Sequence, residues 1–342
     1  MKKNLLVTLA DENYLERAKQ LFSSVYWNAG WKGDYMLLAH EVPEERLKWF
    51  RDKGILVKKC KAIYNKDIFA WPPIMFTKFY LFTPYFKKWG RIVYLDTDII
   101  VRASLERLCK INGFGGCKDL VSLEGQFVDR WAAKKIDAYS YWALVRELKK
   151  HYCLKSQAFN AGVMAFDTRI IEDNTFDKLI RLLKKYEKAL FSCDQAVLNL
   201  RFYKKWANLP LVYNIRANEI EKACGISQKE VRGIIIHSYQ KKPWQTDSFY
   251  YKEWNKNLEK AELIDLKNIP QGKRWTEKEI KEYCSYLKKR RILFYPAYAF
   301  FNIPVFMDIT AGKIGVIIRK ISPGLYNHLK IIKKHIGLEK EL

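Results

Sequence analysis

The sequence predicts an α/β domain built on a largely parallel sheet. Two patterns indicate this fold: short β-branched runs alternate with helical patterns along the first 250 residues, and one apolar strand ends in the two carboxylates Asp96 and Asp98. A strand that ends in polar side chains is typical of the ligand-binding edge of open α/β sheets. The chain of 342 residues is 49% hydrophobic and 15% aromatic, which suffices for a packed core and excludes a disordered chain.

The elements follow from the local pattern of apolar residues. Runs such as Leu5-Leu6-Val7-Thr8-Leu9 are rich in strand-forming residues, and apolar residues at helical spacing follow them. The expected strands are 5–9, 35–39, 55–57, 92–95, 120–123, 162–166 and 233–237. The expected helices are 14–26, 44–53, 75–86, 176–189 and 194–203. The glycine-rich stretch 113–116 lacks the spacing of a phosphate-binding loop and is expected to be a flexible turn.

The composition divides the chain into three segments. Residues 1–250 form the expected catalytic domain, 251–291 a helical extension, and 292–342 a basic, aromatic C-terminal segment. Between residues 281 and 342 there are twelve Lys and Arg against four Asp and Glu. Aromatic rings beside lysines favour contact with an anionic membrane surface, and the alternative is that this segment packs on the catalytic domain as ordinary helices. The longest uncharged stretch, 292–307, contains two prolines and is shorter than the ~20 residues of a spanning helix.

Charge and cysteine content indicate what kind of partner and which cellular compartment to expect. The chain has 62 Lys and Arg against 37 Asp and Glu, so its surface should attract an anionic partner such as nucleic acid, an acidic membrane or phosphorylated substrates. Seven cysteines without a CxxC pair indicate neither a zinc site nor a secreted disulfide framework. The apolar run 5–10 is too short for a signal peptide. We therefore expect a cytoplasmic protein, in peripheral contact with the cytoplasmic membrane face.

Asp96 and Asp98 form a DxD motif at the end of the strand 92–95. In an extended chain, side chains two residues apart lie on one face, so both carboxylates could bind one divalent cation. Hard oxygen ligands suit Mg²⁺ or Mn²⁺. The alternative is that the pair only turns the chain or caps a helix.

Three further blocks follow the DxD motif in order. They are Phe159-Asn160-Ala161-Gly162 before a strand, Cys193-Asp194-Gln195 at the start of a helix, and His237 followed by Lys241-Lys242-Pro243-Trp244. Together the four blocks resemble glycosyltransferase family 8, over about residues 4–245. The resemblance implies the GT-A fold, a Rossmann-like nucleotide-binding sandwich. It also implies a retaining, Mn²⁺-dependent hexosyltransferase that uses UDP-glucose or UDP-galactose, with Mg²⁺ as the alternative ion.

The resemblance also implies roles for individual residues. Asp96, Asp98 and His237 correspond to the metal ligands, and Asp194 and Gln195 to the catalytic pair beside the donor sugar. Because an amide is a poor nucleophile, Gln195 is expected to support an oxocarbenium ion rather than form a covalent intermediate. The residues expected to bind the nucleotide sugar are Thr8, Leu9, Ala10, Asp11, Tyr14, Lys78, Asp96, Thr97, Asn160, Ala161, Gly162, Lys241 and Lys242.

The chain departs from the family pattern in one loop. The family reads His-x-x-Gly-x-x-Lys-Pro-Trp, whereas the loop after His237 is one residue shorter and has Gln240 at the glycine position. A glycine lets the backbone approach a phosphate closely, so the diphosphate contacts of this loop should differ, with Lys241 and Lys242 sharing the role. The segment 126–155 either faces the acceptor or belongs to the core; its aromatic and imidazole residues are Trp131, Tyr139, Tyr141, Trp142 and His151.

Three functions are compatible with these observations. The first is transfer of a hexose to a glycan or glycolipid acceptor, such as a lipopolysaccharide, and the second is a self-glycosylating primer of the glycogenin kind. The third, a basic nucleic-acid-binding protein, has no recognised binding motif here and leaves Asp96 and Asp98 unexplained. The sequence therefore favours a sugar transferase, with no nucleic acid among its partners.

Overall fold

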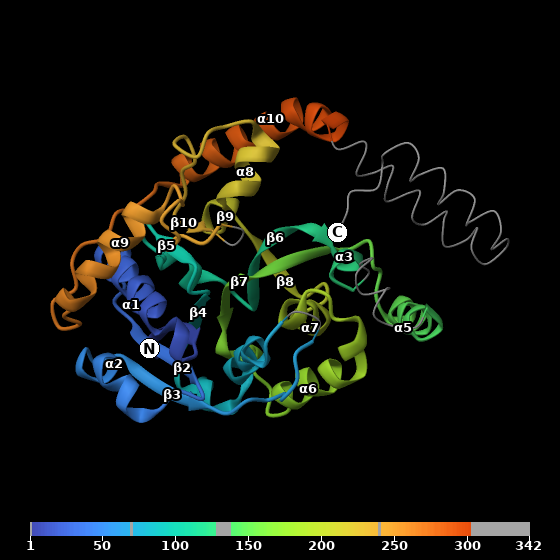
Figure 1. Cartoon of the computed structure of the whole chain (residues 1–342), viewed down its shortest axis with the longest axis horizontal. Helices are drawn as coiled ribbons and strands as arrows, with labels where there is room; N and C mark the ends of the chain where they lie inside the picture. Colours follow the sequence, from blue (N-terminus) through green and yellow to red (C-terminus); the bar gives the residue numbers. More distant parts are fainter. Residues whose placement is uncertain (1, 69–70, 128–137, 239–240, 302–342) are drawn as a thin grey trace.

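The computed structural model describes residues 2–68, 71–127, 138–238 and 241–301 (Figure 1). Its main sheet has seven strands in the order β3-β2-β1-β4-β7-β6-β8. These strands are β1 (Asn4–Ala10), β2 (Asp34–His40), β3 (Leu56–Cys60), β4 (Arg91–Leu95), β6 (Phe114–Ser122), β7 (Gln157–Asp167) and β8 (Trp206–Leu209). Only β7 runs antiparallel to its neighbours β4 and β6, and the other described pairs are parallel. The mostly parallel α/β sheet expected from the sequence is confirmed.

Strand alternation gives the sheet an apolar core on each side. In β1, Leu6 and Ala10 belong to one core, and Leu5, Val7 and Leu9 belong to the other, because successive side chains point to opposite faces. The first core is completed by α1 (Leu15–Ser24), α2 (Lys48–Asp52), α8 (Ala217–Cys224), α9 (Tyr251–Glu259) and α10 (Glu277–Phe301). The second is completed by α3 (Leu123–Phe127), α5 (Ala138–His151), α6 (Thr175–Tyr186) and α7 (Cys193–Arg201).

A second, three-stranded sheet positions part of the site. It consists of β5 (Ile99–Val101), β10 (Ile235–His237) and β9 (Ile215–Arg216), in that order. β10 runs antiparallel to β5 and parallel to β9, so His237 lies opposite Ile99 and beside Arg216. Because β5 follows β4 after three residues, this small sheet brings the end of β10 to the carboxyl end of the main sheet.

Several expected elements differ in the structure. The block Phe159–Gly162, expected just before a strand, lies inside β7, which begins at Gln157. The helix expected at 75–86 is two 3₁₀ segments, Pro73–Phe82 and Pro84–Lys88, because Thr83 precedes a proline and adopts an extended backbone. The strand expected at 120–123 begins at Phe114 and ends at Ser122 as β6, and α3 begins at Leu123. The glycine-rich stretch is therefore mostly strand, not a flexible turn. A Cβ at Gly116 would lie 3.0 Å from the Cβ of Phe159, so glycine allows the close packing of β6 on β7.

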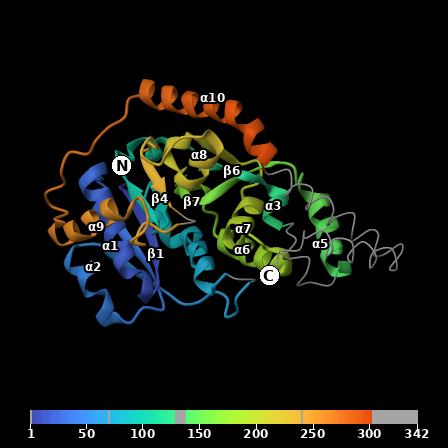
Figure 2. The same ribbon diagram turned by 45° about the horizontal axis from the view of Figure 1, so that its top comes forward.

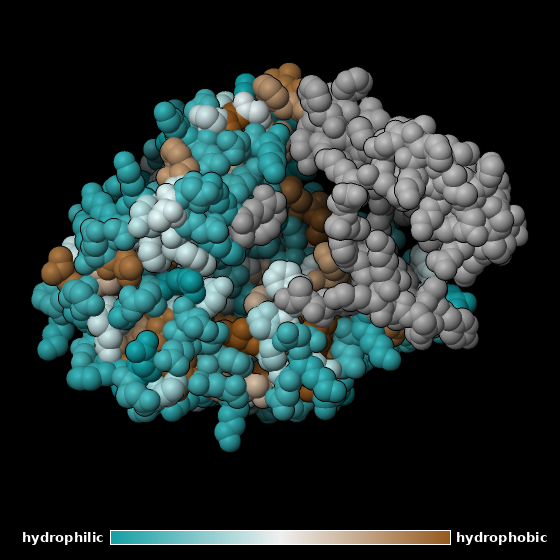
Figure 3. Space-filling view, in the orientation of Figure 1, coloured by the Kyte–Doolittle hydropathy of each residue, from teal (hydrophilic) through white to brown (hydrophobic). Residues whose placement is uncertain are grey.

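The C-terminal helix α10 packs against α8 (Figure 2). Leu287 is buried, and the Arg290 guanidinium donates hydrogen bonds to the carbonyl oxygens of Cys224 (3.1 Å) and Gly225 (2.6 Å). This helix continues past residue 291, where the sequence placed the end of the helical extension and the start of the segment 292–342. Residues 302–342 lie outside the described residues, so most of that segment does as well. Hydrophilic side chains cover most of the described surface seen in Figure 3. Within the described ranges, no helix is long and apolar enough to cross a membrane.

Candidate active site

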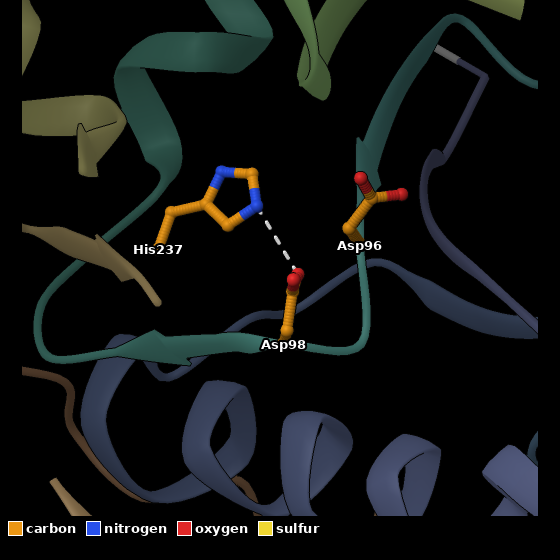
Figure 4. Close-up of side chains that lie close together, drawn as sticks. All are labelled: Asp96, Asp98 and His237. Atoms are coloured by element: carbon orange, nitrogen blue, oxygen red, sulfur yellow. Dashed lines mark ion pairs between the residues drawn. The ribbon is translucent and has the colours of Figure 1, made fainter. Parts of the chain in front are cut away.

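Two strand ends and the small sheet bring the three predicted metal ligands together (Figure 4). Asp96 follows β4, Asp98 precedes β5, and His237 ends β10. One ligand atom from each lies within 4.8 Å of the others, and the imidazole Nε2 of His237 is 3.1 Å from Asp98 Oδ1. The DxD residues occupy a turn rather than an extended segment, which corrects the geometry expected from the sequence. The two carboxylates converge because the chain turns between β4 and β5 (Figure 4).

Backbone contacts fix this arrangement. The Asp96 N–H donates to the carbonyl of Gly162 (2.9 Å), and the Ser238 N–H donates to the carbonyl of Asp98 (3.2 Å). A Cβ at Gly162 would lie well under 3.0 Å from His237 Cε1 and 3.0 Å from Asp96 Oδ2. Only glycine therefore lets β7 approach the cluster this closely.

Lys78 links the cluster of Asp96, Asp98 and His237 to the predicted catalytic pair. Its ammonium lies 3.1 Å from Asp96 Oδ1 and 3.0 Å from Asp194 Oδ2, and its side chain is 3% exposed. Burial alone would lower the pKa of Lys78, but the two carboxylates raise it, so the lysine stays charged. Burial raises the pKa of Asp194 against the opposing effect of Lys78. The Tyr94 hydroxyl also donates to Asp96 Oδ1 (2.7 Å), a contact that the sequence did not predict.

Of the two lysines after His237, Lys242 reaches the cluster. Its ammonium lies 2.6 Å from Asp98 Oδ2, whereas Lys241 pairs with Asp247 at 2.7 Å and is half exposed. The two lysines were expected to share one role, but only Lys242 contacts the cluster, and Lys241 contacts Asp247 instead. Burial acts to raise the pKa of Asp98, but His237 and Lys242 outweigh it and lower that pKa below its usual range. Asp98 is therefore a carboxylate.

Gln195 is held on both sides of its amide. Its Oε1 accepts hydrogen bonds from the Ala161 N–H (2.9 Å) and the Asn160 side chain (3.0 Å), and its Nε2 donates to Asp119 Oδ2 (2.7 Å). Asp119 in turn forms a buried ion pair with Arg216. The sequence analysis missed Asp119 and Arg216. The local signal was weak, because Asp119 follows another charged residue, Lys118, and Arg216 follows the polar Asn214 by two residues.

The residues between Thr8 and Tyr14 that are predicted to bind the nucleotide sugar lie at the end of β1 and in the loop that follows it. Thr8, Leu9 and Ala10 are buried strand residues, and the Thr8 hydroxyl donates to the carbonyl of Leu95 (2.8 Å), which ties β1 to β4. The Asp11 carboxylate accepts from the Tyr14 N–H (3.1 Å) and caps the following turn. Thr97, which separates the two aspartates of the DxD motif in the sequence, is buried.

An aromatic and cationic stack joins this loop to the Lys242 loop. The Arg17 guanidinium lies 4.1 Å from the ring centre of Tyr14 and 4.3 Å from that of Trp244. The two rings meet edge to face at 5.9 Å. The loop after β1 and the Lys242 loop are therefore in direct contact.

The segment predicted to face the acceptor is partly described. Trp131 and the side chains of Tyr139 and Tyr141 lie outside the described residues. Trp142 is 46% exposed on α5, and His151 is exposed and 3.2 Å from Glu147. Both residues are therefore on the surface rather than in the core.

The residues present fit a divalent cation. Ligand atoms bound to one ion at about 2.1 Å lie roughly 3 to 4 Å apart, so a small contraction of the cluster suffices. Asp98 Oδ1 is buried and lies 3.1 Å from His237 Nε2, so two of the proposed ligand atoms are already neighbours. Two carboxylates and one imidazole are suitable ligands for Mn²⁺.

Sheet order and site together define the GT-A class of fold, and solved structures of glycosyltransferases share it. An active-site mutant of LgtC matches with a TM-score of 0.56 at 18% identity, covering 74% of this chain and 94% of that chain. GlyE of Streptococcus pneumoniae matches with a TM-score of 0.51 at 20% identity, covering 83% of this chain and 64% of that chain. The chain belongs to glycosyl transferase family 8, whose family model matches residues 5–248.

Curated relatives agree with this family. Glycosyltransferase GlyB of Streptococcus pneumoniae is 23% identical over 296 residues, covering 77% of this chain and 66% of that protein. The lipopolysaccharide 1,2-glucosyltransferase of Escherichia coli is 26% identical over 238 residues, covering 66% of this chain and 65% of that protein. Galactinol synthase 1 of Arabidopsis thaliana is 24% identical over 197 residues, covering 51% of each. The chain thus spans about half to two thirds of the length of these relatives.

Proposed function

We propose that this chain is a retaining hexosyltransferase that transfers glucose or galactose from a UDP-sugar to a glycan or glycolipid acceptor. The observation that supports this most strongly is the continuous polar site at the carboxyl end of the sheet. It begins at Lys242, passes through the cluster of Asp96, Asp98 and His237, and reaches Asp194 and Gln195 through Lys78.

Asp96, Asp98 and His237 would hold the divalent ion, for which Mn²⁺ is the proposal and Mg²⁺ the alternative. When bound, the ion supplies positive charge to the donor diphosphate, which gains negative charge as the glycosidic bond breaks. Lys242 is placed to act on the same charge, because its ammonium already lies against the cluster and its stem is long and flexible.

Lys78 and Asp194 would orient the donor sugar. Both are nearly fully buried and form one ion pair, so their polar atoms are held in fixed positions beside Asp96. Asn160 supplies a further amide at this end of the site. Fixed polar groups that match the hydroxyls of one sugar discriminate against another, which makes these residues the proposed determinants of donor choice.

Gln195 would act on the reacting face of the sugar. Its amide is fixed by three hydrogen bonds and is chemically a poor nucleophile, so attack by the acceptor on the same face as the leaving group is favoured over a covalent intermediate. The amide dipole is preorganised and can stabilise positive charge on the sugar at no reorganisation cost.

The membrane part of the proposal concerns the acceptor. A glycolipid acceptor of the lipopolysaccharide type would be met at the cytoplasmic membrane face, with the basic segment 292–342 contacting anionic lipid. Ile292 and Leu293, at the described start of this segment, are exposed on α10, and so is Arg291 just before it.

A donor screen tests the enzymatic proposal. The full chain is incubated with UDP-glucose, UDP-galactose and other UDP-sugars, with Mn²⁺ or with excess EDTA, and released UDP is measured. We expect Mn²⁺-dependent hydrolysis of one hexose donor and loss of that activity in Asp98→Asn. Equal activity in EDTA, or an unaffected variant, would contradict the proposed site.

A further inference from the structure

We infer that Asn214 is a positioning residue that orients the metal ligand His237 and the catalytic amide Gln195 through one chain of hydrogen bonds. This inference rests on the proposed function. Asn214 follows a short 3₁₀ turn, directly precedes β9, and is 1% exposed. Its Nδ2 lies 2.8 Å from Asn160 Oδ1, and its Oδ1 lies 2.9 Å from His237 Nδ1.

Two backbone donors fix the direction of the whole chain. The Ala161 N–H can only donate, so the atom of Gln195 that faces it at 2.9 Å is the amide oxygen. The Gly162 N–H likewise can only donate, so the atom of Asn160 that faces it at 3.1 Å is Oδ1. These two N–H donors therefore determine which end of each amide is the oxygen and which is the nitrogen.

The remaining orientations follow from these two. Because Asn160 presents its oxygen to Asn214, the facing atom of Asn214 is the nitrogen donor. The other end of the Asn214 amide is then an oxygen, and the ring atom opposite it, His237 Nδ1, must carry a proton. His237 therefore directs Nε2 toward the two carboxylates, as a ligand to a shared metal ion would.

A hydrogen-bond acceptor on the second ring nitrogen of a metal-binding histidine measurably increases metal affinity. A histidine that binds a metal through one ring nitrogen is oriented by the acceptor on its other nitrogen, and loss of that acceptor costs about 10- to 100-fold in metal affinity or activity. Asn214 differs from a simple acceptor because its other half donates to Asn160, which donates in turn to Gln195. One buried side chain therefore serves both ends of the site.

The two halves of Asn214 can be separated by substitution. Asn214→Asp keeps an acceptor for His237 but removes the donor to Asn160, whereas Asn214→Leu removes both at similar volume. The matched control is Asn257→Leu, which removes a buried amide from α9, a helix that packs on α1. Mn²⁺ affinity is measured by electron paramagnetic resonance of the free ion, turnover by release of UDP from the donor, and folding by thermal unfolding.

We expect Asn214→Leu to lose about 10- to 100-fold in Mn²⁺ affinity, and Asn214→Asp to bind Mn²⁺ at least as tightly as wild type but to lose about tenfold or more in turnover. Asn257→Leu should retain both properties. Equal Mn²⁺ affinity in wild type and Asn214→Leu, or an equal loss of affinity in both Asn214 variants, would overturn the inference while leaving the metal site intact. Absence of Mn²⁺ binding by the wild-type chain would instead overturn the proposed metal site, and the inference with it.

Discussion

Gly162→Ala is the substitution whose effect on the site can be worked out most directly. The added Cβ would clash with the edge of the His237 ring and lie 3.0 Å from both Asp96 Oδ2 and Asn160 Oδ1, whereas ordinary contacts begin at 3.4 Å. The ring cannot simply rotate away, because its Nδ1 is hydrogen-bonded to Asn214 Oδ1 and its Nε2 faces Asp98. Restoring ordinary contact requires a displacement of about 1 Å, and a displacement of that size can cost about 100-fold in rate.

We therefore expect Gly162→Ala to lose about 100-fold in kcat/KM for donor hydrolysis, which corresponds to about 2.7 kcal/mol of transition-state stabilisation. Overpacking should lower the free energy of unfolding by only about 1–3 kcal/mol, so the variant still folds. Gly90→Ala is the matched control, because its Cβ would lie 3.3 Å or more from its neighbours in a turn before β4. UDP release and denaturant unfolding are measured on both variants. Wild-type kcat/KM in Gly162→Ala would refute the packing argument, and so would an equal loss in Gly90→Ala.

The other predictions concern the cluster, the catalytic amide, acid stability and the C-terminal segment. Asp98→Asn should abolish Mn²⁺-dependent UDP release yet keep wild-type circular dichroism; unchanged turnover would contradict the ligand assignment. Gln195→Ala should lower kcat more than it raises donor KM, since a group that stabilises the transition state acts mainly on kcat, and a pure KM effect would make Gln195 a binding residue. The pKa of Asp98 is lowered in the folded chain, so its contribution to stability is present above the unfolded pKa of about 4 and is lost as pH falls below it. Denaturant midpoints of the metal-free chain should accordingly fall more steeply between about pH 5 and pH 3 in wild type than in Asp98→Asn, and parallel slopes would argue against this. A chain ending at Phe301, beyond the buried Leu287 anchor, should fold, release UDP and lose the salt-sensitive binding to anionic liposomes expected of the full chain; equal binding by both would remove the membrane role from the C-terminal segment.

The sequence predicted the parts of this site that depend on local pattern. The strand preceding Asp96, the small residues after Asn160 and the helix that begins near Asp194 each follow from a short stretch of chain. The resemblance to glycosyltransferase family 8 then predicted that His237 would join the two carboxylates, and the structure brings them together.

The parts it missed depend on pairing between distant positions. Asp119 and Arg216 are 97 residues apart and form a buried ion pair only because β6 and β9 lie at the same end of the fold. Nothing in the local sequence marks Asn214, because its two partners, Asn160 and His237, come from β7 and β10. The turn at Thr97 was misjudged for a related reason. Residues two apart share a face in an extended strand, but the chain turns here to begin the second sheet.

The proposed metal-dependent site is tested most directly by a crystal structure of the full chain grown with Mn²⁺ and UDP, with anomalous diffraction recorded at the manganese edge. We expect one anomalous peak bonded to Asp96, Asp98 and His237, with the UDP diphosphate as a further ligand. We also expect the Lys242 ammonium to have moved from Asp98 Oδ2, its partner at 2.6 Å in the metal-free chain, to the diphosphate. A manganese peak away from these three residues, or UDP bound with Lys242 still paired to Asp98 and no metal between them, would contradict the proposed site.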